Sequence, residues 1–280
     1  MPHSRDAVAC RLAREYLLSF ASAGVTEELL RLYLEPTTAQ LRPTSIGGIY
    51  ERLLESAQNA NMRAGVVGKA IGGVSKLRTV LCDFDPNQVC ERFTHGWEGV
   101  LDAVQRELAP RGKIRRTARS IWPLFCRTVL SGAEFLSEFS DGADFHAWVE
   151  VFDRDDRIRP ALPMLLSYEI DGFGFPLACD FLKELGYLNF GKPDVHVKAI
   201  LSGLALAPPG ADDYRVFKSI LRIARGQEVT PYYVDKLFWL VGSGYFYNHR
   251  GIGSQGRIGT DRERFIREAR AKLDPHPGKA

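Results

Sequence analysis

An aspartate and a glycine-rich turn are the residues of this chain whose types and spacing could perform chemistry together. Asp194 follows 20 residues after the turn Gly172-Phe173-Gly174. A carboxylate can stabilise positive charge that develops on a sugar, and it can orient or deprotonate an attacking water. Because Phe190, Pro193, Val195 and Val197 surround Asp194 in sequence, we expect an apolar environment that raises its pKa. Alternatively, Asp194 caps the helix that follows, and one residue can do both.

The glycine turn lies between two predicted helices. Apolar residues at 162, 165, 166 and 170 predict one helix that ends near Glu169, and those at 177, 178, 181, 182 and 185 predict a second that ends at Gly186. Pro176 suits the first turn of the second helix, where its missing N–H is not needed. Glycines allow close backbone approach, and the amides that open a helix attract anions, so the turn could hold a phosphate. The alternative is a plain helical hairpin whose glycines only reverse the chain.

Residues 170–178 and 193–197 together resemble the hairpin and the Val-Asp-x-His-Val segment of the helix-hairpin-helix (HhH-GPD) DNA glycosylases. This superfamily includes endonuclease III, 8-oxoguanine glycosylase and the alkyladenine glycosylases. The resemblance implies an all-α, two-lobed fold with a cleft between the lobes, and a base flipped out of double-stranded DNA. It implies that Asp194 is catalytic, and that DNA is bound by Gly172, Phe173, Gly174, Pro176, His196 and Lys198.

Three further segments resemble the same superfamily. Residues 50–61 resemble the helix and loop from which Gln58, Asn59 and Asn61 would enter the DNA, and residues 112–121 resemble the next segment. Residues 230–240 resemble the late helix whose Tyr232, Asp235 and Trp239 would line the base pocket. Alternatively, these aromatic side chains are core residues, and Asp235 and Lys236 form a surface pair.

Pro176 departs from the superfamily pattern in a way that bears on mechanism. Members that also nick the strand carry a lysine at this position, whose amine forms a Schiff base. The resemblance therefore implies a monofunctional glycosylase that uses water. The alternatives are a bifunctional glycosylase and lyase that uses Lys183 or Lys192, a non-catalytic hairpin protein that binds DNA, and a helical scaffold unrelated to DNA.

Composition agrees with an enzyme that binds DNA locally. The 280 residues are 45% hydrophobic and carry a net charge of only +3, so DNA affinity must come from a local patch. Lys113, Arg115, Arg116 and Arg119 could form one, or could be a solvated helix face. The five cysteines are scattered, and the last 100 residues contain none. We therefore expect no iron–sulfur cluster, no disulfide framework and no other metal, except for an alkali or alkaline-earth cation at the hairpin.

The chain has no apolar run of the length that a membrane span requires. We expect a cytoplasmic monomer, associated with the nucleoid if bacterial. Helices are predicted near 6–22, 26–35, 49–59, 62–72, 86–93, 97–109, 113–130, 132–138, 143–150, 158–169, 175–185, 194–204, 212–225, 231–241 and 260–272. We group them as N-terminal helices (1–45) that pack on the second lobe, a core lobe (46–158), the hairpin with the catalytic aspartate (159–204), and C-terminal helices (205–280) that complete the N-terminal lobe and end in a partly loose tail.

Overall fold

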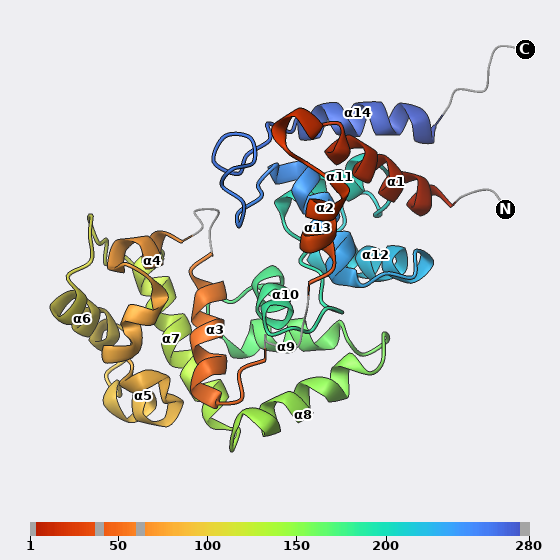
Figure 1. The fold of residues 1–280 in the computed structure, drawn as a ribbon. Helices are drawn as coiled ribbons and strands as arrows, with labels where there is room; N and C mark the ends of the chain where they lie inside the picture. The colour runs from red at the N-terminus through yellow and green to blue at the C-terminus, as the bar shows by residue number, and fades with distance from the viewer. Residues whose placement is uncertain (1–3, 37–41, 60–64, 275–280) are drawn as a thin grey trace, which may run out of the picture. The chain divides into compact units, whose positions relative to one another are not determined.

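The computed structural model describes residues 4–36, 42–59 and 65–274, and helices dominate it (Figure 1). In those ranges the regular elements are α- and 3-10 helices, and β-bridges occur only as the isolated pairs Tyr245–Arg257 and Ser254–Arg257. The all-α class predicted from the sequence is therefore confirmed. No helix in the described part of the chain is long and apolar enough to cross a membrane.

The chain folds into two compact units. Unit 1 comprises residues 1–38 and 188–280, and unit 2 comprises residues 39–187. The boundary falls inside the segment 159–204, which the sequence predicts as a single part. The glycine turn therefore belongs to unit 2 and Asp194 to unit 1.

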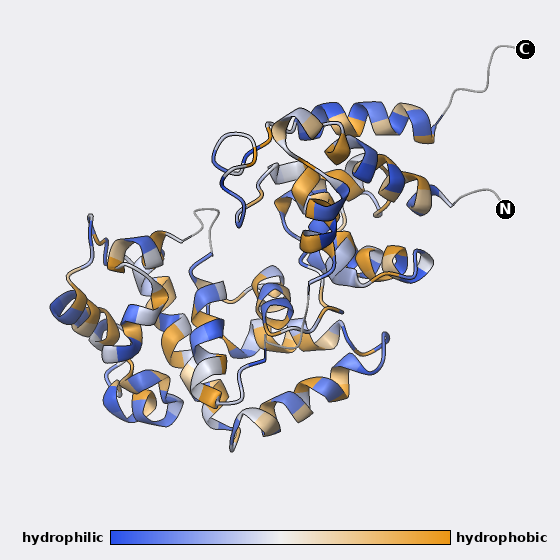
Figure 2. Cartoon of the chain, viewed as in Figure 1, coloured by the Kyte–Doolittle hydropathy of each residue, from blue (hydrophilic) through white to orange (hydrophobic). Residues whose placement is uncertain are grey.

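Unit 1 is built around α13 (Pro231–Ser243), which packs against the other α-helices of the unit. These are α1 (Arg5–Leu18), α2 (Glu27–Leu34), α11 (Val195–Gly203), α12 (Asp213–Gly226) and α14 (Arg262–Leu273), with the short 3-10 helix η1 (Ala21–Ala23) after α1. Helices α1 and α14 lie side by side (Figure 1). Hydrophilic and hydrophobic residues alternate along α14 (Figure 2), whose Phe265 and Ala269 are buried in the core of the unit. Two charged residues in the first turns of α13, Asp235 and Lys236, are buried.

Unit 2 is built around α7 (Ile121–Ser137), which packs against helices that precede it in the chain and against α9 (Ala161–Glu169), which follows it. Its other elements are α3 (Ile46–Ala57), α4 (Val66–Ile71), η3 (Val74–Thr79), η4 (Cys82–Phe84), α5 (Pro86–Arg92), α6 (Trp97–Leu108), α8 (Gly142–Asp153), α9 (Ala161–Glu169) and α10 (Phe175–Glu184). Helices α9 and α10 pack against each other. They are the two helices that the sequence predicts on either side of the glycine turn.

Helix α7 differs from its prediction at its start and at the break expected at residue 131. The sequence predicts helices over 113–130 and 132–138, whereas one helix runs from Ile121 to Ser137. Pro123 lacks an N–H and would clash with the preceding turn, so it is compatible with a helix only in the first turn. Gly132 does not break the helix, because α3 packs against it. A Cβ at that position would lie 3.2 Å from Leu53 Cδ2.

One buried hydrogen bond joins α3 to α7, and it provides a test of unit 2. Tyr50 is fully buried, and its hydroxyl donates to Val129 O at 2.6 Å. We expect Tyr50→Phe to lower the free energy of unfolding by about 1 kcal/mol, the usual net value of such a bond. Urea denaturation measures this change. Tyr168→Phe is the matched control, because Tyr168 is 85% exposed and its replacement should change nothing.

Candidate functional site

Asp194 is the N-cap of α11, as predicted. Its Oδ1 accepts hydrogen bonds from the backbone N–H groups of His196 and Val197, both at 2.9 Å. The second carboxylate oxygen, Oδ2, makes no hydrogen bond to any residue in the described part of the chain. The side chain is half-buried. The cap thus fixes the carboxylate in one orientation and leaves one oxygen for a substrate or a water.

The environment of Asp194 raises its pKa. Burial of the carboxylate is the largest cause, and the nearby Asp235 carboxylate acts in the same direction. The hydrogen bond from the Val197 amide lowers the pKa, as do the electrostatic interactions with His196 and Lys192, but they do not cancel the effect of burial. The rise predicted from the apolar sequence around Asp194 is confirmed in direction and in cause.

Asp235 holds the segment that leads to Asp194. It is 2% exposed, and its Oδ2 accepts a hydrogen bond from the backbone N–H of Lys192 at 2.9 Å. The backbone approaches closely here, since a Cβ at Gly191 would lie 3.3 Å from Asp235 Cβ. The alternative interpretation of Asp235 and Lys236 as a surface pair is wrong, because packing of α13 against the 188–194 segment buries position 235.

The raised pKa of Asp194 predicts a pH dependence. If the ionised carboxylate is required, activity should rise with pH along an acidic limb whose midpoint lies above 3.8, the ordinary value for aspartate. Asp235→Asn should move this midpoint to lower pH, because it removes a nearby negative charge while an amide oxygen can still accept from Lys192. Rate constants measured between pH 3.5 and 8 test both statements. A midpoint that Asp235→Asn leaves in place would contradict the assigned cause.

His196 and Lys198, which were both predicted to bind DNA, are not freely exposed. The Nδ1 atom of His196 is buried and has no hydrogen-bond partner among the described residues. Its ring lies against Gly242, where a Cβ would be 2.8 Å from Nδ1. Lys198 Nζ lies 2.5 Å from Asp213 Oδ1. A phosphate at Lys198 would therefore have to compete with that carboxylate, and only the remaining edge of the His196 ring could reach one.

In unit 2 the glycine turn presents its backbone outward. Gly172 has φ +73°, in the left-handed region that favours glycine, and both Gly172 and Gly174 are exposed. Their N–H groups have no partner in the described part of unit 2. Phe173 is different, because its ring is buried against Phe181 and its N–H donates to Ile170 O at 3.1 Å. The buried ring of Phe173 therefore anchors the turn to unit 2 and cannot contact a ligand.

Two hydroxyl groups of α7 anchor Asp171, the residue that precedes the turn. Thr128 Oγ1 donates to Asp171 O at 2.6 Å, and the Asp171 N–H donates to Ser131 Oγ at 2.9 Å. Both polar groups of the Asp171 backbone are thereby satisfied within unit 2. The next residue, Gly172, has a Cβ position 3.1 Å from Thr128 Oγ1. A helix thus holds the turn in place, and no sequence pattern indicates this contact.

Gln58 lies beside the turn, whereas Asn59 folds back on its own helix. Gln58 and Gly172 both line a hollow of about 200 Å³ in unit 2, and the Gln58 side chain lies against Gly68 of α4. Asn59 Nδ2 donates to Glu55 O at 3.4 Å. Asn61, the third residue predicted to enter the DNA, lies outside the described residues.

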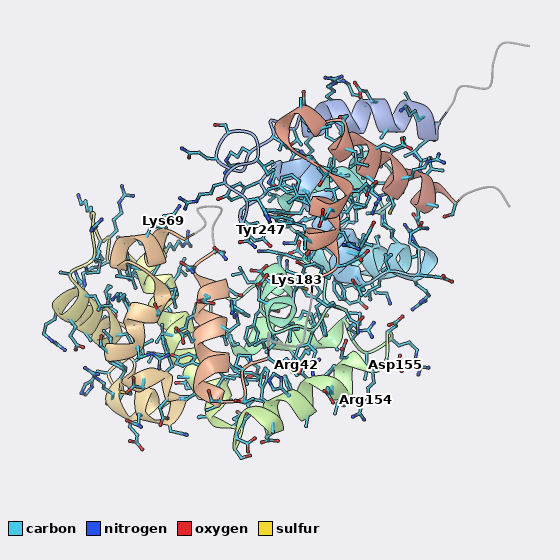
Figure 3. The ribbon with its side chains drawn as sticks, viewed as in Figure 1. Arg42, Lys69, Arg154, Asp155, Lys183 and Tyr247 are labelled. Carbon is cyan, nitrogen blue, oxygen red and sulfur yellow. The ribbon has the colours of Figure 1, made fainter. Side chains whose placement is uncertain are left out.

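Pro176 is confirmed in the first turn of α10. The lysine that follows on the same helix, Lys183 (Figure 3), has its Nζ 3.3 Å from Asp180 Oδ1. A charged ammonium is not nucleophilic, and this one is engaged by a carboxylate. Lys183 would have to leave this pair before it could attack a sugar.

The predicted basic cluster lies on a loop and not on a helix face. Residues 109–120 precede α7, and Lys113, Arg115, Arg116 and Arg119 are all exposed there. Arg116 is held by α6, because it donates to Asp102 at 2.6 Å and to Gln105 at 2.8 Å. Lys113, Arg115 and Arg119 lie exposed at the surface of unit 2, where a polyanion could bind.

The predicted site residues do not include Lys236 or Tyr247, which the structure brings to the predicted base-pocket residues. Lys236 Nζ lies 5.4 Å from the ring centroid of Tyr232 and 5.0 Å from that of Trp239. Tyr247, on the loop between α13 and α14 (Figure 3), contributes a third ring at 5.0 Å. The spacing of 232, 236 and 239 on one helix face could have revealed the first two contacts. Nothing in the sequence points to Tyr247.

Known proteins resemble this chain in fold. No known protein family matches the sequence, and no curated protein is detectably similar to it. The structure is similar to that of the 8-oxoguanine glycosylase/lyase of Methanocaldococcus jannaschii, solved in complex with a 15mer DNA containing 8-oxoguanine. The TM-score is 0.51 at 16% identity, over 82% of this chain and 96% of that chain. The 8-oxoguanine DNA glycosylase of Thermotoga maritima has a TM-score of 0.43 at 15% identity, over 82% of this chain and 92% of that one. The first of these similarities shows that the chain shares the fold of an 8-oxoguanine glycosylase/lyase, in agreement with the fold that the resemblance in sequence implied.

Proposed function

We propose that this protein is a monofunctional DNA glycosylase, which hydrolyses the N-glycosidic bond of a damaged or modified base in duplex DNA. The observation that carries the proposal is Asp194. It is a half-buried carboxylate with a raised pKa and one oxygen not engaged by the cap. The glycosylase fold and the exposed Gly172–Gly174 turn support it.

The proposed reaction uses water as the nucleophile. As the bond between C1′ and the base nitrogen breaks, its electron pair leaves with the base, and positive charge develops on the sugar. Asp194 stabilises that charge and accepts a proton from the water whose oxygen bonds to C1′. The departing base takes up a proton from solvent. The products are the free base and an abasic site in an intact strand.

The turn of unit 2 has the role of binding the DNA backbone. The N–H groups of Gly172 and Gly174 would donate to one phosphate at the positive end of the α10 dipole. A cation at this turn is part of the same proposal. Backbone carbonyl oxygens and the exposed Asp171 carboxylate are hard donors of the kind that alkali and alkaline-earth ions take. Such an ion would supply positive charge beside the phosphate. The proposed partner is double-stranded DNA with a damaged base, bound by a monomer.

Duplexes that each carry one lesion test the function directly. We expect at least one base to be released, with a strand break that appears only after mild alkali, because Pro176 cannot form a Schiff base. Breakage without alkali, together with a borohydride-trapped adduct lost in Lys183→Gln or Lys192→Gln, would instead identify a bifunctional enzyme. Release of no base, with duplex binding retained, would identify a non-catalytic DNA-binding protein.

A further inference from the structure

Lys236 forms the centre of a cluster of aromatic rings, which we name the Lys236 cluster: Tyr232, Lys236, Trp239 and Tyr247. The ammonium lies over all three rings at 5.0–5.4 Å from their centroids. Its Nζ also lies 3.3 Å from the Tyr247 hydroxyl. Ring faces attract cations, so these contacts restrict the position of the ammonium.

The loop after α13 holds Tyr247 in the cluster. The backbone N–H of the next residue, Asn248, donates to Tyr33 Oη at 2.9 Å. The ring of Tyr33 packs edge-on against Tyr247 at 5.2 Å, and Trp239 does so at 6.0 Å. On the other side of Tyr247, Phe246 is buried, and its N–H donates to Gly256 O at 2.7 Å. The loop is thus tied to α2 and to itself, and Tyr247 is fixed by both connections.

The Lys236 cluster is joined to the proposed catalytic carboxylate through one helix. Asp235 precedes Lys236 on α13, holds the Lys192 backbone, and raises the pKa of Asp194 by its charge. Successive residues of a helix point about 100° apart, so Asp235 faces the Asp194 segment while Lys236 faces the rings. The positive charge of Lys236 is therefore one residue along α13 from Asp235, the carboxylate that lies near Asp194.

We propose that Lys236 selects the base, and that this enzyme excises neutral bases that carry carbonyl oxygens and rejects cationic alkylated purines. The proposal rests on the proposed function. An ammonium donates hydrogen bonds to carbonyl oxygen or ring nitrogen acceptors, and aromatic rings provide stacking for an extruded base. The same fixed charge repels a base that carries its own positive charge, such as 7-methylguanine. Rings alone would favour such a cation, so Lys236 reverses the preference that Tyr232, Trp239 and Tyr247 would have without it.

The test measures single-turnover release from matched duplexes that contain 8-oxoguanine, uracil, hypoxanthine or 7-methylguanine, each corrected for spontaneous loss. We expect the unaltered protein to release at least one neutral base at least about tenfold faster than 7-methylguanine. Lys236→Met, which keeps length but removes the charge, should reduce that ratio by about tenfold or more. Lys236→Arg, which keeps the charge, should preserve it. Circular dichroism of each variant verifies folding.

The outcomes separate this proposal from the proposed function. Release of 7-methylguanine by the unaltered protein as fast as, or faster than, every neutral base overturns the proposal and leaves a glycosylase. An unchanged ratio in a folded Lys236→Met variant does the same. If Lys236→Met does not fold, the preference of the unaltered protein decides the matter. Release of no base from any duplex overturns both proposals.

Discussion

Replacement of Asp194 by Asn should reduce the rate of base release by about 100-fold or more while the protein stays folded. Asparagine has nearly the same shape, but it carries no charge to stabilise a positive sugar and accepts no proton from water. Loss of a single preorganised electrostatic group typically costs a factor of this size. Single-turnover release of the best substrate from the lesion panel measures it.

The helix cap offers a control that separates chemistry from stability at this position. Asparagine is as good an N-cap as aspartate, so Asp194→Asn should retain the hydrogen bonds to His196 and Val197. Asp194→Ala removes the cap as well, and should cost about 1 kcal/mol of unfolding free energy in addition to the activity. DNA affinity should persist in Asp194→Asn, because a negative charge is removed and none is added. If Asp194→Asn released the base at a rate within a few-fold of that of the unaltered protein, the assignment of Asp194 as a catalytic residue would be wrong.

Gly174→Ala should weaken binding of duplex DNA by roughly tenfold to a hundredfold without a loss of stability. Gly174 has φ −65°, which any residue adopts, and an added Cβ would meet nothing closer than Pro176 Cδ at 3.9 Å. The methyl group is therefore harmless to the fold, but it stands on the exposed side of the turn, where a phosphate must approach the amide. A hydrogen bond to a charged group is worth about 1.5–3 kcal/mol, which corresponds to that range of affinity.

The neighbouring glycine gives the contrasting result. Gly172 has φ +73°, and a Cβ there would press on Thr128 Oγ1 at 3.1 Å. Gly172→Ala should lose about 1–2 kcal/mol of stability as well as DNA affinity. Fluorescence anisotropy with a labelled duplex and urea denaturation of both variants measure the two effects separately. Unchanged affinity in a folded Gly174→Ala variant would show that the turn binds no phosphate.

The sequence by itself determined the local structure at the proposed site. Helix α13 begins at Pro231, Asp194 caps α11, and Pro176 lies in the first turn of α10, all as predicted. The reason is physical, because a cap or a proline acts on amides within three or four residues, and these neighbours are fixed by the chain itself. The apolar residues around Asp194 likewise predicted the direction of its pKa.

Only the tertiary structure decided which side chains meet across longer separations. Asp235 reaches the Lys192 backbone 43 residues away, Thr128 reaches the Asp171 carbonyl at the same separation, and Tyr247 joins the Lys236 cluster from a loop. Composition and periodicity specify that a face is buried, but not which polar atom on that face finds a partner, because this depends on how whole helices pack. The extent of α7 depends on both local sequence and packing. Pro123 marks the start of the helix locally, whereas packing against α3 keeps Gly132 within it.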